Sequence, residues 1–408
     1  MEYTLVCRDC KAKITDQSSY HCPYCKGTLD CEFDLTSHEE KMASLIKNAH
    51  SFWDYAPLFP VKHEYRITMG EGRTPLVVAE RLAQELDMAS VLIKNEATNP
   101  TGTFKDRCMS LSLTKALELG APAVALGSAG NAGAAAAAYA ARAQIPCYVL
   151  LPASTPIERV AQTLMYGAKM ISVRGTTTDC IEMIAEACDT HGWHNVTTAS
   201  AYNPYQAEAT KAIAFEIAQA MNWSVPDWIL VPIGGGGILS GIYKGYRQMQ
   251  ALGLISRLPR IVGVQASGCA AVVEAFKKGK APDQIKRWDN PSGIAVAIAD
   301  PYPMDGISAL TAIYNSKGYS EMVSDGEILK AQSLLASREG IFAEPASATT
   351  VAGLAKLLEA GVIKSGETAV CVVTGTGMKD PQLALEQVQR PPVVDLDMAQ
   401  LDVVLRTF

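Results

Sequence analysis

The sequence NPTGTFKDR, Asn99 to Arg107, directly follows the β-rich run VLIKNEAT. A strand that ends in a turn rich in Gly and Thr and leads into a helical stretch is typical of a βα unit. In this turn Lys105 stands beside Phe104, and an amine held away from water has a lowered pKa and is suited to form a Schiff base. Taken alone, the same lysine also fits the first turn of an ordinary surface helix. Lys105 is therefore the first candidate for a reactive residue.

Similar units extend over most of the chain. Short β-rich runs alternate with Ala- and Leu-rich stretches of helical period. The runs are VLIKNEA, AVALGSA, CYVLLPA, KMISVRG, WILVPIGG, RIVGVQA and TAVCVVTG. Strands that alternate with helices indicate mainly parallel sheets buried on both faces, so the sequence predicts an α/β fold. Ligands are expected where these strands end and the next helices begin.

Length and composition limit the class of protein. The chain has 408 residues, 48% of them hydrophobic and 19% charged, which excludes a disordered chain and predicts two or three domains. A net charge of −6 excludes a basic field that would hold nucleic acid or an anionic membrane. The beginning of the chain lacks an export signal, and Gly, Arg and Pro interrupt the most apolar segment. We therefore expect a cytoplasmic protein with a small-molecule substrate, without nucleic-acid or membrane partners.

The first 35 residues differ from the rest, since they hold five of the eleven cysteines. Cys7 and Cys10 form one Cys-x-x-Cys pair, and Cys22 and Cys25 form a second one after eleven intervening residues. Two such turns complete a closed tetrahedral site for structural zinc, which supplies folding energy that so small a module lacks. Free thiols are the alternative. We predict a zinc ribbon over residues 1–35.

Three further strand ends carry unusual loops. The first loop consists of Ser128, Ala129, Gly130 and Asn131, and the second of Gly234, Gly235, Gly236 and Gly237 followed by Ile238. The first loop opens an Ala-rich helical stretch, where backbone N–H groups and the helix dipole favour a carboxylate. In the second loop the absence of Cβ atoms lets the backbone wrap a phosphate. The third loop, VVTGTGMKD, follows another strand, and its Thr374 hydroxyl is a candidate hydrogen-bond partner for a ring nitrogen of a bound ligand. Plain structural turns are the alternative for all three.

Together with EPASA at 344–348, these loops occur in the order and spacing of the pyridoxal-phosphate enzymes of fold type II. The chain resembles the threonine synthases most, and also the serine and threonine dehydratases, from about residue 70 to 385. Some members carry an N-terminal zinc ribbon. The resemblance implies pyridoxal 5'-phosphate as cofactor, two α/β domains of the tryptophan synthase β type, and a homodimer.

The resemblance also implies roles around the cofactor ring. Lys105 would hold the cofactor and act as general base and acid at the substrate carbons, and Phe104 would flank the ring. Asn131 would bond the ring hydroxyl oxygen, while the Ser128–Asn131 loop would bind the substrate carboxylate. Glu344 would lie nearby as an acid or base.

At the other end of the cofactor, the resemblance assigns the phosphate to Gly234–Gly237 with Ile238. Thr374 would be the hydroxyl partner of the ring nitrogen. A neutral partner leaves that nitrogen largely unprotonated, which suits elimination and replacement better than transamination.

The same resemblance divides the chain into five parts. They are the ribbon at 1–35, an N-terminal arm and the start of the large domain at 36–85, a small mobile domain with the cofactor lysine at about 86–205, the large domain with the phosphate loop at 206–385, and a C-terminal tail at 386–408.

The chain departs from the threonine synthase pattern at the substrate phosphate. Ser200, Ala201 and Gln206 stand where that family has Asn, Ser and Arg. Loss of a cation that binds the phosphate through two hydrogen bonds lowers the binding free energy by several kcal/mol, at about 1.5–3 kcal/mol for each charged hydrogen bond. The glycine loop is also similar to that of the dehydratases. We therefore expect a lyase that eliminates from a β-hydroxy or other β-substituted amino acid, with a bulky uncharged β-substituent, and releases a 2-oxo acid and ammonia.

Three alternatives remain open. The first is a threonine synthase acting on O-phosphohomoserine, with a phosphate site rebuilt from Lys94, Arg107 or Arg159. The second is β-replacement by an added nucleophile. The third is a zinc-ribbon interaction protein on a silent enzyme fold, which the intact Lys105 and glycine loop oppose.

Overall fold

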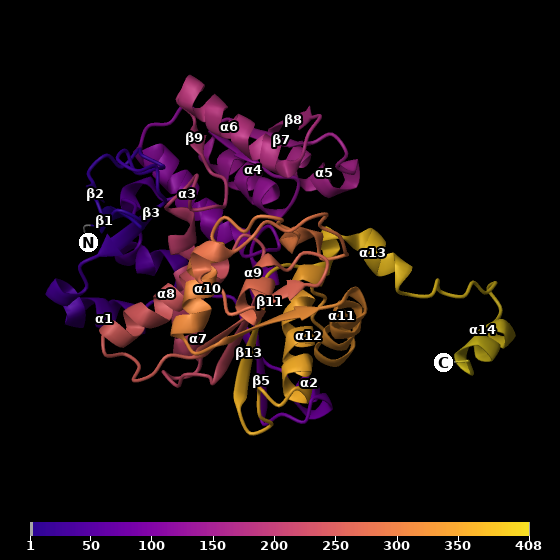
Figure 1. Ribbon diagram of the computed structural model, residues 1–408. Helices are drawn as coiled ribbons and strands as arrows, with labels where there is room; N and C mark the ends of the chain where they lie inside the picture. The colour runs from indigo at the N-terminus through magenta and orange to yellow at the C-terminus, as the bar shows by residue number, and fades with distance from the viewer. Residues whose placement is uncertain (1–2, 408) are drawn as a thin grey trace.

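The computed structural model describes residues 3–407, so residues 1, 2 and 408 of the predicted ribbon and tail lie outside the described residues. The described strands form a three-stranded, a six-stranded and a four-stranded sheet. Figure 1 shows the ribbon in indigo at one side, the unit of the four-stranded sheet above, and the unit of the six-stranded sheet below. The predicted α/β architecture with mainly parallel sheets is confirmed.

The six-stranded sheet has the order β12-β11-β10-β13-β5-β4 and is parallel except for β4 at its edge. Its strands are β4 (Leu76–Val78), β5 (Ser90–Asn95), β10 (Trp228–Pro232), β11 (Arg260–Ala266), β12 (Tyr319–Val323) and β13 (Thr368–Val373). Helices cover both faces, so alternate residues of one strand enter different cores: Ile229 and Val231 pack in one, Trp228 and Leu230 in the other. The continuous apolar runs of the sequence follow from this double burial.

The helices of this unit divide between the two faces. On one side pack α7 (Lys211–Ala220), α8 (Gly237–Ala251), α9 (Ala271–Lys277) and α10 (Gly306–Asn315). On the other side pack α2 (Glu80–Glu85), α11 (Asp325–Glu339) and α12 (Pro345–Glu359). Short 3-10 helices connect them: η4 (Glu96–Thr98), η5 (Gln206–Thr210), η6 (Pro282–Gln284), η7 (Val296–Ile298) and η8 (Gly377–Lys379).

The four-stranded sheet is parallel, with the order β8-β7-β6-β9. Its strands are β6 (Val124–Gly127), β7 (Cys147–Pro152), β8 (Lys169–Val173) and β9 (His194–Asn195). Its helices are α3 (Lys105–Glu118), α4 (Asn131–Ala143), α5 (Ile157–Met165) and α6 (Thr177–His191). The small side chains of Ala134 to Ala138 are all buried, and they let α4 approach α3 closely.

The ribbon consists of the antiparallel strands β1 (Tyr3–Cys7), β2 (Lys13–Ile14) and β3 (Leu29–Phe33). Its small core includes Tyr205 from the body of the protein, so the ribbon is fixed to the body by apolar contact. An arm follows, made of η1 (Thr36–His38), α1 (Glu39–Lys47), η2 (Phe52–Leu58) and η3 (His63–Tyr65). Phe52 and Phe59 of this arm are buried in the core over α7 and α8.

The C-terminal segment contains α13 (Pro381–Glu386) and α14 (Met398–Leu405). In Figure 1 it leads away from the body as the yellow end of the chain. Val393 and Leu396 are exposed along it. No helix within residues 3–407 combines the length and the apolar character needed to cross a bilayer.

All seven predicted strands are present, and their pairing adds detail to the predicted domains. The strand β5 falls in the segment 86–205 expected for the small domain, yet it belongs to the six-stranded sheet because it pairs with β13 and β4. The domain limits themselves stay predictions. The sequence missed three strands of these two sheets: β12, an edge strand that contains Ser320 and Glu321, β4, which has three residues, and β9, which has only two.

Candidate active site

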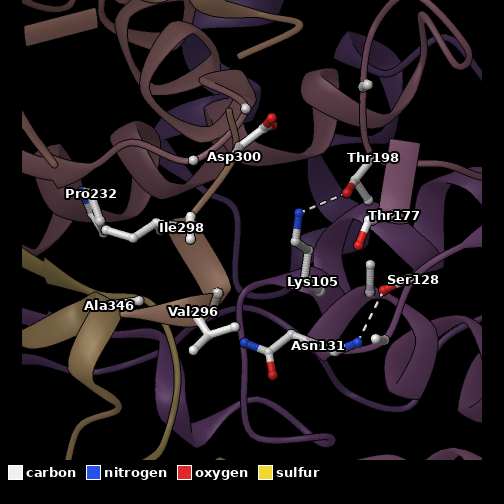
Figure 2. Close-up of a pocket in the computed structure, with 18 of the residues that line it drawn as sticks. Lys105, Ser128, Asn131, Thr177, Thr198, Pro232, Val296, Ile298, Asp300 and Ala346 are labelled. Atoms are coloured by element: carbon white, nitrogen blue, oxygen red, sulfur yellow. Dashed lines mark hydrogen bonds between the residues drawn. The ribbon is translucent and has the colours of Figure 1, made fainter. Parts of the chain in front are cut away.

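A cavity of about 880 Å³ opens where the carboxyl ends of strands from both parallel sheets meet. All four loops predicted from the sequence line it, and Figure 2 shows Lys105, Ser128 and Asn131 from two of them. The predicted residues in its wall are Phe104, Lys105, Ser128, Ala129, Gly130, Asn131, Gly234, Gly235, Gly236, Gly237, Ile238, Glu344 and Thr374. The fold thus assembles in one site residues that lie up to two thirds of the chain apart.

Lys105 is the first residue of α3 and projects into this cavity (Figure 2). Its Nζ donates a hydrogen bond to Thr198 Oγ1 over 2.8 Å and lies 4.8 Å from the centre of the Phe104 ring. Burial lowers the pKa of Lys105, although nearby acidic groups, among them Asp305, oppose the shift. A lowered pKa increases the neutral fraction of an amine, and the neutral form is the one that attacks a carbonyl and accepts a proton.

The loop that carries Lys105 is fixed to the loop after β13. Phe104 N donates to Thr374 O over 2.9 Å, and Thr376 N donates to Gly102 O over 3.0 Å. Gly102 has a φ of +85°, and a Cβ there would lie 2.8 Å from Thr376 Cγ2. The Gly-Thr sequence of this turn therefore serves the close approach of two strand ends.

The loop from Ser128 to Asn131 ends β6 and begins α4. Ser128 Oγ accepts hydrogen bonds from Gly130 N over 3.3 Å and from Gly133 N over 3.2 Å. The Asn131 side chain points across the cavity, where its Nδ2 donates to Glu344 Oε2 over 3.0 Å. The first residues of α4 line the cavity, and the positive end of the helix dipole at this place favours an anion.

The glycine loop ends β10 and begins α8. Gly236 has a φ of +104°, and a Cβ there would lie 2.8 Å from Asp305 O, so only glycine fits. A Cβ on Gly237 would lie 3.1 Å from Asp305 Oδ2 and 3.2 Å from Gln206 Nε2. Gln206 Nε2 is buried and has no hydrogen-bond partner within residues 3–407. A phosphate at the start of α8 supplies the acceptor that this donor lacks, so the loop fits the cofactor phosphate.

Beside β13, the side chains of Thr374, Ser347 and Glu344 form a polar group at the cavity wall, which Thr374 and Glu344 line. The hydroxyls of Thr374 and Ser347 lie 2.8 Å apart, and Thr374 Oγ1 donates to Glu344 Oε1 over 3.5 Å. Burial raises the pKa of Glu344, and the hydrogen bond from Asn131 and the charge of Lys379 oppose the rise. A ring nitrogen at this place would meet a hydroxyl pair and a carboxyl whose pKa burial raises.

Two carboxyl groups line the side of the glycine loop, and the sequence interpretation missed both. Burial raises the pKa of Asp300 to about 6, and the nearby charge of Asp305 contributes. Burial also raises the pKa of Asp305, while the charge of Arg8 opposes it. Asp300 Oδ2 lies 3.5 Å from the place that a Cβ of Gly235 would take. Thr198 and Ser347 were missed as well, because a single Thr or Ser carries no signal of its own.

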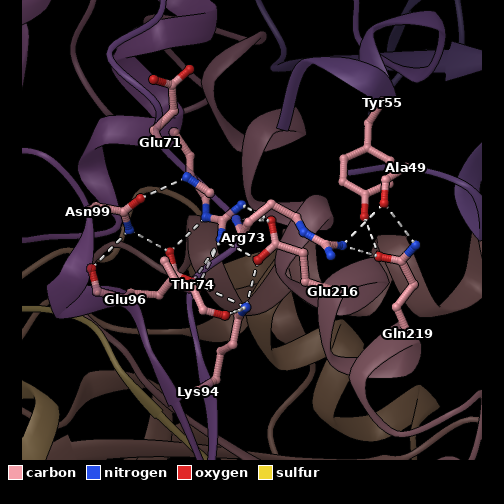
Figure 3. A network of polar contacts seen from close by, with 12 residues as sticks. Ala49, Tyr55, Glu71, Arg73, Thr74, Lys94, Glu96, Asn99, Glu216 and Gln219 are labelled. Carbon is pink, nitrogen blue, oxygen red and sulfur yellow. Dashed lines mark hydrogen bonds and ion pairs between the residues drawn. The ribbon is translucent and has the colours of Figure 1, made fainter. Parts of the chain in front are cut away.

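Of the three cations considered for a substrate phosphate, only Arg159 lines the cavity. Lys94 and Arg107 are completely buried in an ion cluster outside it. Figure 3 shows Lys94 of this cluster beside Glu96 and Glu216. Arg107 Nε lies 2.7 Å from Glu96 Oε2 and its Nη1 2.6 Å from Glu216 Oε1, while Lys94 Nζ lies 2.6 Å from Glu216 Oε2. Their charges are thus matched by two carboxylates and hold β5, α3 and α7 together, so the expectation for Lys94 and Arg107 was wrong.

A cation that the sequence did not indicate takes a place near Arg159. Lys379 follows β13 in η8, lines the cavity and donates through Nζ to Gln162 Oε1 on α5. Burial lowers the pKa of Lys379, and the charge of Glu344 opposes the shift. Arg159 lies on α5 three residues before Gln162. The two cations therefore come from different units of the protein and face the same part of the cavity.

The four ribbon cysteines gather as predicted. The Sγ atoms of Cys7, Cys10, Cys22 and Cys25 all lie within 4.8 Å of one another. Cys7 and Cys25 are 3.4 Å apart at Sγ, and Cys10 and Cys22 are 3.5 Å apart. Tetrahedral zinc with Zn–S bonds of about 2.3 Å requires sulfur atoms about 3.8 Å apart, so the donor set fits zinc.

Comparisons with known proteins agree with this geometry. The model of a family described as "Pyridoxal-phosphate dependent enzyme" matches residues 67–375. The threonine synthase of Methanosarcina acetivorans is 43% identical over 398 residues, which are 97% of both chains. The threonine synthase of Methanocaldococcus jannaschii is 41% identical over 400 residues, again 97% of both chains.

Two solved structures show the same fold at low identity. Threonine deaminase isoform 2 from Solanum lycopersicum has a TM-score of 0.66 at 19% identity, over 86% of this chain and 92% of that one. Diaminopropionate ammonia lyase from Escherichia coli has a TM-score of 0.68 at 15% identity, over 95% of this chain and 96% of that one.

Proposed function

The chain belongs to the family of pyridoxal-phosphate dependent enzymes, and on that premise we propose that it is a threonine synthase, which converts O-phosphohomoserine and water into threonine and inorganic phosphate. The observation that carries this proposal is the identity of 43% and 41% with two proteins of that name, over 97% of the chain in each case. At 97% coverage these matches extend over most of the ribbon as well as the enzyme body. They favour this reaction over the ammonia-lyase reaction that we ranked first from the sequence.

The cavity suits the cofactor of the family. Lys105 would bind its carbonyl carbon, and the glycine loop with Ile238 and Gln206 would bind its phosphate. Asn131 would bond the ring hydroxyl oxygen, and Thr374 would face the ring nitrogen. The cofactor, when bound, supplies an electron sink that stabilises negative charge on the substrate carbons.

The protein's own residues would bind the substrate and move its protons. Lys105 is the amine whose lowered pKa suits it to take a proton from the α-carbon and to return one later. The Ser128–Asn131 loop would hold the substrate carboxylate at the start of α4. Glu344, whose pKa burial raises, would keep a proton near Asn131 and Thr374.

For the substrate phosphate we propose Arg159 and Lys379. Both line the cavity, and the positive charges of both act on Glu344. One comes from α5 and the other from η8, so a phosphate between them would draw the two units together. This pair would replace the cation that is missing at Gln206.

An assay of purified holoenzyme with O-phosphohomoserine tests the proposal. We expect equal amounts of inorganic phosphate and threonine. Arg159→Ala and Lys379→Ala should raise KM at least about tenfold, the effect of losing roughly 1.4 kcal/mol of binding. Arg174→Ala, which removes an exposed cation after β8, is the matched control and should leave KM unchanged. Absence of phosphate release from the intact holoenzyme contradicts the proposal.

The second candidate is elimination of a neutral β-substituent to give a 2-oxo acid and ammonia. It is favoured by Asp300, a carboxyl that lines the cavity beside the glycine loop and keeps its proton up to about pH 6. In its ionised form this carboxyl group repels a substrate phosphate. In its protonated form it can donate the proton to a leaving hydroxyl. Formation of 2-oxo acid from a panel of β-hydroxy amino acids, without phosphate release from O-phosphohomoserine, would favour this candidate.

We also propose that Cys7, Cys10, Cys22 and Cys25 bind one structural zinc ion and that the enzyme is a homodimer. Elemental analysis should find about one zinc per chain, which the four-ligand site requires. Cys10→Ser with Cys25→Ser should abolish zinc binding. Light scattering of the purified protein tests the dimer, and a monomer mass would contradict it.

A further inference from the structure

Arg8 lies in the ribbon between the cysteines Cys7 and Cys10, and its side chain reaches the body of the enzyme. Its Nη1 donates to Ser308 Oγ over 2.7 Å, although 300 residues separate the two in sequence. The same Nη1 lies 3.8 Å from Asp305 Oδ1. The turn that carries two cysteine ligands thus also carries a contact with the start of α10.

Asp305 in turn supports the glycine loop. Its backbone N donates to Gly235 O over 2.8 Å, and its carbonyl and carboxyl oxygens approach Gly236 and Gly237 so closely that a Cβ on either would meet them at 2.8 Å and 3.1 Å. The side chain is 1% exposed and accepts a hydrogen bond from Ser200 N at 3.2 Å. Any shift of Asp305 therefore shifts the loop that would hold the cofactor phosphate.

When Asp305 is ionised, its negative charge lies beside the proposed phosphate site and requires a nearby cation. A buried carboxylate beside a phosphate site repels the phosphate unless a cation compensates it. Arg8 forms the ion pair with Asp305 among the described residues, and its charge opposes the effect of burial on the pKa of Asp305. Lys105 is also near, but its amine is assigned to the cofactor.

A second contact joins the ribbon to the other side of the cavity. The Tyr20 hydroxyl accepts a hydrogen bond from Asn195 N over 2.9 Å. Asn195 Oδ1 accepts from Thr197 N over 2.9 Å, and the next residue, Thr198, accepts from Lys105 Nζ over 2.8 Å. The ribbon therefore touches the segment that carries the partner of the reactive lysine as well as the support of the glycine loop.

We propose that Arg8 is a positioning residue through which the metal site of the ribbon sets the affinity for the cofactor. Metal bound by Cys7 and Cys10 fixes Arg8, Arg8 holds and neutralises Asp305, and Asp305 holds Gly235 to Gly237 in the shape that binds phosphate. The proposal rests on the zinc ligands and the cofactor site proposed above, and it is independent of the substrate.

The first test is a titration of the zinc-loaded apoenzyme with pyridoxal phosphate, followed by absorbance. Arg8→Ala should raise the Kd at least about tenfold, because one partner of a largely buried charge pair is lost. Arg8→Lys, which keeps the charge, should recover part of the affinity. Lys13→Ala removes an exposed ribbon cation and should leave the Kd unchanged. A wild-type Kd for Arg8→Ala at full zinc content would overturn the proposal.

Asp305→Asn distinguishes positioning from a general loss of structure. With the buried charge removed, adding Arg8→Ala should change the Kd less than about twofold, since coupled residues are not additive. Equal losses in both backgrounds would mean that Arg8 acts by another route.

The role of the metal is tested by a chelator. Removal of zinc should weaken cofactor binding in the wild type and have no further effect in Arg8→Ala. If the wild type binds the cofactor equally with and without zinc, the coupling to the metal is wrong. If the purified protein carries no metal, the zinc proposal fails, whereas the titration of Arg8→Ala still decides the role of Arg8.

Discussion

Asn131 and Glu344 join the two main units of the protein across the cavity, with Asn131 Nδ2 donating to Glu344 Oε2 over 3.0 Å. Asn131 begins α4 beside the four-stranded sheet, and Glu344 directly precedes α12 on the six-stranded sheet. The protonation of one carboxyl thus acts on a contact between the units, at the place where the cofactor ring is expected.

Glu344→Gln should remove a dependence of stability on pH. Burial raises the pKa of Glu344, so this group stabilises the fold fully below its ordinary pKa and loses that contribution as pH rises through the raised pKa. The difference in unfolding free energy between the variant and the wild type should therefore grow in favour of the variant as pH rises. Urea unfolding of the apoenzyme at several pH values measures it. The exposed Glu359→Gln is the control, and a difference independent of pH would contradict the prediction.

Asp300→Asn should change how cofactor affinity depends on pH. Burial raises the pKa of Asp300 to about 6, and its carboxyl lies beside Gly235. Above that pH the wild type carries a negative charge next to the phosphate site, so its Kd for pyridoxal phosphate should rise relative to that of the variant. The ratio of the two Kd values, measured from pH 5 to pH 8, cancels the titration of the cofactor itself. A constant ratio would place Asp300 away from the phosphate.

Arg107→Met should lower the free energy of unfolding strongly, although Arg107 does not line the cavity. The substitution leaves Glu96 and Glu216 with less compensating charge in the buried cluster of Figure 3. Removing one partner of a buried ion pair costs about 3–5 kcal/mol of unfolding free energy. Arg338→Ala, which breaks the exposed pair with Glu85, should cost at most about 1 kcal/mol. Similar losses for both, measured by urea unfolding, would contradict the structural role of the cluster.

Gly236→Ala should weaken cofactor binding more than about tenfold. The φ of +104° is strained for alanine, and the new Cβ would lie 2.8 Å from Asp305 O. Gly326→Ala in α11 is the matched control, because its Cβ meets nothing within 4 Å and alanine favours a helix by up to about 1 kcal/mol. If Gly236→Ala binds pyridoxal phosphate as the wild type does, the loop is not the phosphate site.

The sequence predicted those functional segments whose residues are neighbours along the chain. The glycine loop, the turn before Lys105 and the cysteine pairs are each recognisable from neighbouring residues. The first two line the cavity, and the four cysteines lie together. Six of the seven strands were found because burial on both faces makes their sequences continuously apolar, whereas β8 is an edge strand whose residues are exposed or half-buried.

Other contributions come only from the tertiary fold. Asp300 and Thr198 each reach the cavity from connecting segments without a recognisable motif. The contact of Arg8 with Ser308 spans 300 residues. Lys94 appeared available for a phosphate because a sequence does not show that Glu216 from α7 would neutralise it.

The central claim is that Lys105 holds the cofactor in this cavity, and the most direct measurement is to locate the cofactor on the chain. The holoenzyme is reduced with borohydride and digested, and the peptide that carries the pyridoxal group is sequenced by mass spectrometry. We predict the adduct on Lys105 in the wild type and no adduct in Lys105→Ala. An adduct on Lys379, a second lysine in the cavity wall, or no adduct in the wild type would contradict it.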